Sequence, residues 1–120
     1  MTLYTFGYAR STLLEFLDLL RREGIALVVD VRRAPHSRWA QWSREHLEEE
    51  LGERYTWLPK LGNAAGSSDE EAGLKRLEGL LRRHGKVLLL CVEPDHRRCH
   101  RARIAEQMAQ RLPGLQVIHV

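Results

Sequence analysis

The feature that most constrains the fold is an alternation of short apolar runs with amphipathic segments along the 120 residues. Each of the first four apolar runs is followed by a stretch that has apolar residues at helical spacing. This alternation predicts a parallel sheet with helices on both faces. We therefore expect an α/β fold, with one domain over residues 1–120: a three-layer sandwich around a mainly parallel sheet of about five strands.

The expected strands differ in how continuously apolar they are, and this predicts their place in the sheet. The run "KVLLLCVE" is the most continuous, which is typical of a central strand covered on both faces. The alternation does not fix the order of the strands. The five expected strands cover residues 3–8, 25–31, 54–59, 86–93 and 115–120.

Capping residues and glycines mark the ends of the expected helices. Thr12 with Glu15 fits a capping box, and Gly24 stands where a helix commonly stops. Ser68 with Glu71 fits a second capping box. Helices are expected over residues 13–23, 43–50, 68–84 and 97–112.

The composition places the chain in a broad class. With 43% hydrophobic and 29% charged residues it is typical of a globular protein, and its net charge of +3 favours anionic partners without the polybasic character of charge-driven nucleic-acid binding. We see no export signal and no membrane span, and expect a cytoplasmic protein that does not act at a membrane. We also expect its two cysteines, Cys91 and Cys99, to be free thiols.

Polar residues follow four of the expected strands directly. In an open α/β sheet, ligands bind at the carboxyl ends of the strands, so these four segments are expected to meet there. The coincidence predicts a cleft at that edge. The segments are "GYAR", "DVRRAPHS", "LPKLGN" and "CVEPDHRRCHR".

Three charged residues of these segments are expected to point inward. Asp30 interrupts an apolar strand, and Arg32 points to the same face because it lies two residues on. Arg101 falls on the buried stripe of the last helix. We expect Arg101 to be paired with Asp30, with Glu93 or with a bound anion, since a buried unpaired charge is costly.

The cysteine-containing segment allows several interpretations. Cys91 is expected at the mouth of the cleft, where nearby arginines and a helix N-terminus favour the thiolate. Its spacing to Arg97 is that of cysteine phosphatases and sulfurtransferase-like folds, but Glu93 would repel phosphate. A zinc site is the alternative, although the spacing lacks the short knuckle of structural zinc sites. Its ligands would be Cys91, His96, Cys99 and His100.

Three ordered motifs resemble the DUF488 family of small proteins of unknown function. They are G-[HY]-[SA] near the start, D-V-R-x-x-P-x-S after the second strand and C-x-E…C-H-R after the fourth. Tyr8-Ala9 stands where the family more often has His-Ser, and the loop after Gly62 is short. The resemblance implies an α/β fold and a common site, but no reaction. The matching positions are Gly7, Tyr8, Asp30, Arg32, Pro35, Ser37, Leu61, Gly62, Cys91, Glu93, Cys99, His100 and Arg101.

We expect the cleft to bind an anionic small molecule, such as a phosphate-bearing compound or a nucleotide, and we leave open whether it is an enzyme. The alternatives are a nucleic-acid-binding module that uses Trp39 and Trp42 for stacking, a thiolate or zinc site, and a purely structural polar cluster. No cofactor and no metal are assigned. The candidate catalytic residues are Cys91, Glu93, Asp30 and His100, and the candidate ligand-binding residues are Gly7, Tyr8, Arg32, Ser37 and Arg101.

Overall fold

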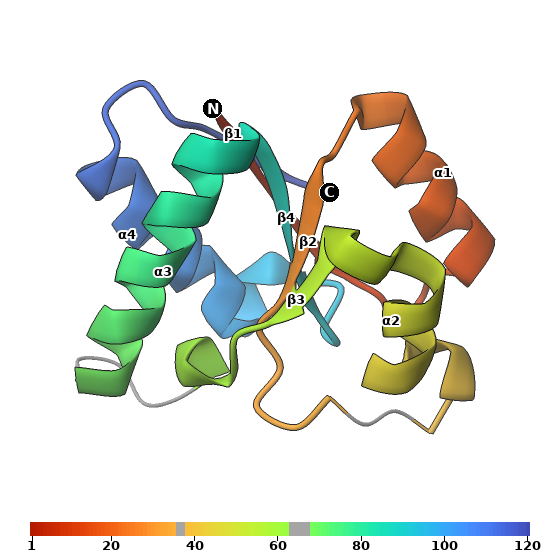
Figure 1. The fold of residues 1–120 in the computed structure, drawn as a ribbon. Coiled ribbons are helices and arrows are strands. Elements are labelled where there is room, and N and C mark those ends of the chain that lie inside the picture. The colour runs from red at the N-terminus through yellow and green to blue at the C-terminus, as the bar shows by residue number, and fades with distance from the viewer. Residues whose placement is uncertain (36–37, 63–67) are drawn as a thin grey trace.

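The structure is a computed structural model that describes residues 1–35, 38–62 and 68–120 (Figure 1). Its strands are β1 Thr2–Gly7, β2 Leu27–Asp30, β3 Tyr55–Trp57, β4 Lys86–Cys91 and β5 Gln116–His119. Its α-helices are α1 Leu13–Glu23, α2 Arg44–Leu51, α3 Ser68–His84 and α4 His100–Arg111. Short 3₁₀ turns occur at η1 Ala40–Trp42, η2 Gly52–Arg54, η3 Pro59–Gly62 and η4 His96–Arg98. No helix in these residues has the length and apolar character that a membrane crossing needs.

The five strands form one sheet in the order β3-β2-β4-β1-β5, and every neighbouring pair is parallel. The expected α/β fold and the central position of β4 are confirmed. In the register, Asp30 lies beside Leu90, and Gly7 lies beside Cys91. The carboxyl ends of β1, β2 and β4 therefore reach the same edge of the sheet.

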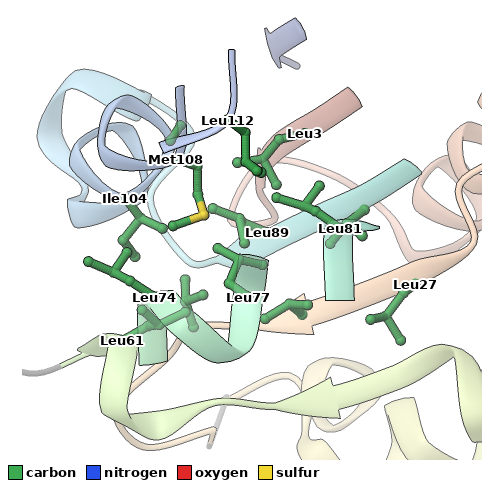
Figure 2. Close-up of a cluster of buried hydrophobic side chains, with 14 of the residues drawn as sticks. Leu3, Leu27, Leu61, Leu74, Leu77, Leu81, Leu89, Ile104, Met108 and Leu112 are labelled. Carbon is green, nitrogen blue, oxygen red and sulfur yellow. The ribbon is translucent and has the colours of Figure 1, made fainter. Parts of the chain in front are cut away.

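Helices α1 and α2 cover one face of the sheet, and α3 and α4 cover the other (Figure 1). Strand β4 sends alternate side chains to the two faces. Leu89 and Cys91 belong to the core cluster that includes residues of α3 and α4, part of which is drawn in Figure 2. Leu88 and Leu90 belong to the cluster that includes residues of α1 and α2. The two faces of the sheet thus have separate cores.

Local signals explain most of the helix ends. The amide N of Glu15 donates to Thr12 Oγ1 at 3.1 Å, and Gly24 ends α1 with a positive φ of 68°. The predicted capping role of Ser68 concerns a side chain outside the described part of the structure. The sequence predicts that the last helix begins at Arg97, but the helix begins at His100. The reason is a separate turn, η4, which Asp95 caps by accepting a hydrogen bond from the amide N of Arg97 at 3.0 Å.

Candidate functional site

A pocket of about 330 Å³ lies at the carboxyl ends of β2 and β4. These two strands are neighbours in the parallel sheet, so the segments that follow them meet at its edge. Of the candidate residues, Arg32, Cys91, Glu93 and His100 line it, whereas Asp30 and Arg101 are fully buried and do not. The lining residues are Arg32, Arg33, Ala34, Cys91, Val92, Glu93, Arg98, Cys99 and His100.

Arg32 and Asp30 form a buried, bidentate ion pair. Nε and Nη2 of Arg32 donate to the two carboxylate oxygens of Asp30 at 2.9 and 2.6 Å. The hydroxyl of Tyr55 also donates to Asp30, and Nη1 of Arg32 donates to the carbonyl of Trp42 at 2.7 Å and to the hydroxyl of Tyr8 at 3.3 Å. Burial opposes the charge of Arg32, but Asp30 outweighs it and raises the pKa of Arg32. Most donors of this guanidinium are therefore occupied within the protein.

Asp30 is not the partner of Arg101. Asp30 contacts Tyr55, which belongs to the core beneath α1 and α2, whereas Arg101 contacts Cys91 in the other core. The sheet separates the two charges. Of the expectations for these residues, the shared face of Asp30 and Arg32 and the inward direction of Arg101 are confirmed, and a pair between Asp30 and Arg101 is wrong.

Arg101 is fully buried in the first turn of α4. Its Nη1 donates to Cys91 Sγ at 3.3 Å and to the carbonyl of Glu93, and its Nη2 donates to the carbonyl of Pro94 at 3.0 Å. In the described residues its Nε has no hydrogen-bond partner, and no carboxylate lies within ion-pair distance. Burial lowers the pKa of Arg101, and the charges of Glu93 and Asp95 oppose this effect.

Cys91 and Cys99 are joined by a disulfide, so the expectation of two free thiols is wrong. The physical reason is the start of the last helix. If the helix began at Arg97, Cys99 would point away from the core. Because α4 begins at His100, Cys99 precedes the helix in an extended conformation and reaches back to the end of β4.

His100 lies between the end of β2 and Cys99. Its Nε2 is 2.9 Å from the carbonyl oxygen of Val31, which can only accept, so Nε2 carries the proton. Its Nδ1 then carries a lone pair and lies 3.7 Å from Cys99 Sγ, but the disulfide sulfur has no proton to donate to it. Burial lowers the pKa of His100, and the charges of Arg103 and Arg101 lower it further. The described residues contain no group of three or more side chains that could hold a metal ion.

Gly7 and Tyr8 hold the end of β1 against the segment that follows β4. A Cβ at Gly7 would lie 1.8 Å from the carbonyl oxygen of Glu93, so only glycine permits this approach. The amide N of Tyr8 donates to the carbonyl of Cys91 at 3.0 Å. The ring of Tyr8 is buried and does not line the pocket. Ser37, the remaining candidate for ligand binding, lies outside the described residues.

Comparison with known families identifies the chain. The sequence model of the family described as "Domain of unknown function DUF488" matches residues 12–70 and 63–108. The chain belongs to the DUF488 family. A search of curated proteins and a search of solved structures each found no match.

Gly62, another position of the DUF488 resemblance, contacts the segment that follows β2. Gly62 packs tightly on Arg33, because a Cβ there would lie 3.0 Å from the backbone of Arg33.

Trp42 is 1% exposed and stacks on Tyr8 with a centroid distance of 4.6 Å, so the interpretation of Trp42 as a stacking surface for nucleic acid is wrong. Trp39 is 45% exposed, with the guanidinium of Arg38 over its ring.

Three polar residues in or beside this site are not among the sequence candidates. Arg33 and Arg98 line the pocket, and Tyr55 donates to Asp30. Arg33 directly follows the candidate Arg32, and Arg98 directly precedes the candidate Cys99. That adjacency is the signal that could have pointed to both arginines. Tyr55 has no such signal, because its contact with Asp30 depends on β3 pairing with β2.

Proposed function

We propose that the pocket at the ends of β2 and β4 binds a small molecule through one anionic oxygen-bearing group, such as a phosphate or a carboxylate. The observation that carries the proposal is the state of Arg33 and Arg98. Both line the pocket, both are exposed, and neither has an ion pair within the described residues. Arginine residues that line a pocket and have no ion-pair partner are suited to bind oxyanions.

The other charges of the pocket favour a group of low charge. The charge of Arg32 is neutralised by Asp30, and Glu93 contributes one negative charge against the two positive charges of Arg33 and Arg98. The positive end of α4, which has no side-chain cap, adds to the attraction for an anion. A carboxylate or a monophosphate, with one or two negative charges, fits this balance better than a polyphosphate does.

Among the candidate catalytic residues, Cys91, Glu93 and His100 line the pocket, which supports a role for them in contacting a bound molecule. Asp30 is covered by Arg32 and Tyr55, so it is a positioning residue in this proposal. The proposed role of Arg32 changes in the same way, from clamping the anion to shaping the wall of the pocket. Arg101 likewise supports the segment that carries Glu93.

The test is a calorimetric titration with inorganic phosphate and, separately, with adenosine monophosphate. We expect Arg33→Ala and Arg98→Ala each to weaken binding by about tenfold, the scale of one charge-assisted hydrogen bond. Arg83→Ala is the matched control, since this exposed arginine lies in the last turn of α3, just before the amino end of β4, whereas the pocket lies at the carboxyl end of that strand. Tighter binding of the nucleotide than of phosphate would identify the source of the anion. Equal affinities in all three variants would contradict the proposal.

A further inference from the structure

The disulfide lies beside a cation that lacks a carboxylate partner. Arg101 is fully buried, and Cys91 Sγ, 3.3 Å from its Nη1, is a hydrogen-bond acceptor that can gain a negative charge. Its other acceptors are the uncharged carbonyls of Glu93 and Pro94. A buried charge without a counter-charge is costly, so the surroundings of Arg101 favour a state in which a negative charge lies close to it.

We propose that Cys91 and Cys99 are a reversible dithiol–disulfide couple that exchanges with small-molecule thiols, and that reduction places a Cys91 thiolate against Arg101. In the disulfide, Cys91 Sγ is neutral and only weakly accepts a hydrogen bond. After reduction, the same contact becomes a charge-assisted hydrogen bond between ions of opposite sign. Arg101 therefore stabilises the reduced protein, which makes the disulfide easier to reduce. This inference does not depend on the anion site proposed above.

The second sulfur, Cys99 Sγ, lies beside a nitrogen that can accept a hydrogen bond. Because Nε2 of His100 donates to Val31, its Nδ1 is a free acceptor that faces Cys99 Sγ. In the reduced protein the Cys99 thiol can donate to this nitrogen. The two sulfurs thus have different surroundings: Cys91 faces a permanent cation, and Cys99 faces a neutral imidazole.

Exposure and leaving-group quality set the direction of attack. Cys99 is half-buried whereas Cys91 is 4% exposed, so the incoming thiolate reaches Cys99 Sγ first. A bond forms between the sulfur of the incoming thiolate and Cys99 Sγ, and the Cys91–Cys99 bond breaks. Cys91 leaves with the electron pair as a thiolate stabilised by Arg101. The stabilised thiolate is the better leaving group, and this also favours attack at Cys99.

A second thiol completes the reaction. Its thiolate attacks the sulfur of the first small molecule, and Cys99 is released and takes up a proton. Two small thiols are thereby oxidised to one small disulfide, the protein disulfide is reduced to Cys91 thiolate and Cys99 thiol, and the remaining proton is released to the solvent. The reverse reaction, with a small disulfide as oxidant, restores the bond.

The test is equilibration of the protein with mixtures of reduced and oxidised glutathione, followed by alkylation and mass measurement of free thiols. We expect the constant for reduction to fall by roughly 10- to 100-fold in Arg101→Gln, the scale of a hydrogen bond to a charged group. Arg101→Lys should lie between the two, since it keeps the charge without the fork. The control is Arg97→Gln, an exposed arginine in the same segment, which should match the wild type. Equal constants in Arg101→Gln and the wild type, or a wild-type bond that forms at no glutathione ratio, would overturn the proposal.

A second measurement leaves Arg101 in place, in case its replacement prevents folding. In Cys99→Ser, the rate at which Cys91 is alkylated is followed against pH. We expect it to be half-maximal well below pH of about 8.5, the value of an ordinary free cysteine. Half-maximal alkylation at or above that value would show that Arg101 does not stabilise the thiolate and would overturn the proposal.

Discussion

Asp30 is the residue on which the buried polar cluster of the structure depends. It accepts from the amide N and two guanidinium nitrogens of Arg32 and from the hydroxyl of Tyr55, and it is fully buried. Asp30→Ala leaves the Arg32 guanidinium buried without a counter-charge. We expect it to lower the free energy of unfolding by about 3–5 kcal/mol, measured by urea denaturation.

Two further variants distinguish the cost of leaving a buried charge unpaired from the cost of losing a surface salt bridge. Asp18→Ala removes an exposed carboxylate that bridges Arg21 and Arg22, and should cost less than about 1 kcal/mol. The double variant Asp30→Leu/Arg32→Met removes both buried charges, and should be more stable than Asp30→Ala. A change in Asp30→Ala no larger than that in Asp18→Ala would contradict the assignment.

At this scale, the sequence predicts which residues are buried better than it predicts their partners. The two-residue spacing of Asp30 and Arg32 places them on one face, and the helical spacing of Arg101 points it inward; both follow from local geometry. The partner of Arg101 depends on which face of the sheet α4 covers. That is a property of the whole topology, and no local pattern contains it.

The segment from β4 to α4 shows the corresponding limit for elements. Its helix is correctly predicted from the apolar stripe that includes Ile104 and Met108, but its start is three residues late relative to the prediction. Helix spacing alone does not detect the turn η4, which depends on the Asp95 side chain. This shift determines where Cys99 lies, because it moves the residue from the helix surface to the position before the helix.

The contact between η4 and β5 predicts a dependence of stability on acid pH. His96 of η4 and His119 of β5 stack with a centroid distance of 3.8 Å, and His119 Nδ1 is hydrogen-bonded to Thr5 Oγ1. Burial lowers the pKa of His119, and His96 and Arg101 lower it further. Its folded pKa thus lies below the unfolded value of about 6.5, so its stabilising effect is present above that value and is lost as the pH falls through the folded pKa.

Urea denaturation from about pH 7 to about pH 5 measures this effect. We expect the free energy of unfolding to fall over this range, and His119→Phe, which keeps a stacking ring without a titrating group, to reduce the fall. His100, whose pKa is also lowered, should account for part of what remains. His46→Gln on α2 is the control. An identical pH profile in His119→Phe and the wild type would contradict the prediction.

For the whole molecule, the alternation of strands and helices predicts the architecture but not the order of the strands. Continuous apolar character identifies β4 as central, and the structure confirms it. Placing β1 and β2 on either side of β4 requires contacts between residues far apart in the sequence, such as Phe6 with Leu90. The site at the edge of the sheet follows from that order, because only neighbouring strands bring their carboxyl ends together. Its general location is therefore predictable from the sequence, whereas its individual contacts are not.

The central position of β4 also affects how the chain folds while it is being synthesised. Strand β1 pairs with β4 and β5, and β2 pairs with β3 and β4, so β1 has no neighbouring strand within the first 85 residues. While the ribosome is still making α3, the nascent chain carries β1 and the pair of β2 and β3 with open, apolar edges. Such edges attract other chains and the chaperones that shield them. The emergence of β4 joins β1 to the pair of β2 and β3 in one step, and of the two edges of β1 only the one that later pairs with β5 stays open, so protease resistance of ribosome-bound chains should rise abruptly once Lys86–Cys91 has left the exit tunnel.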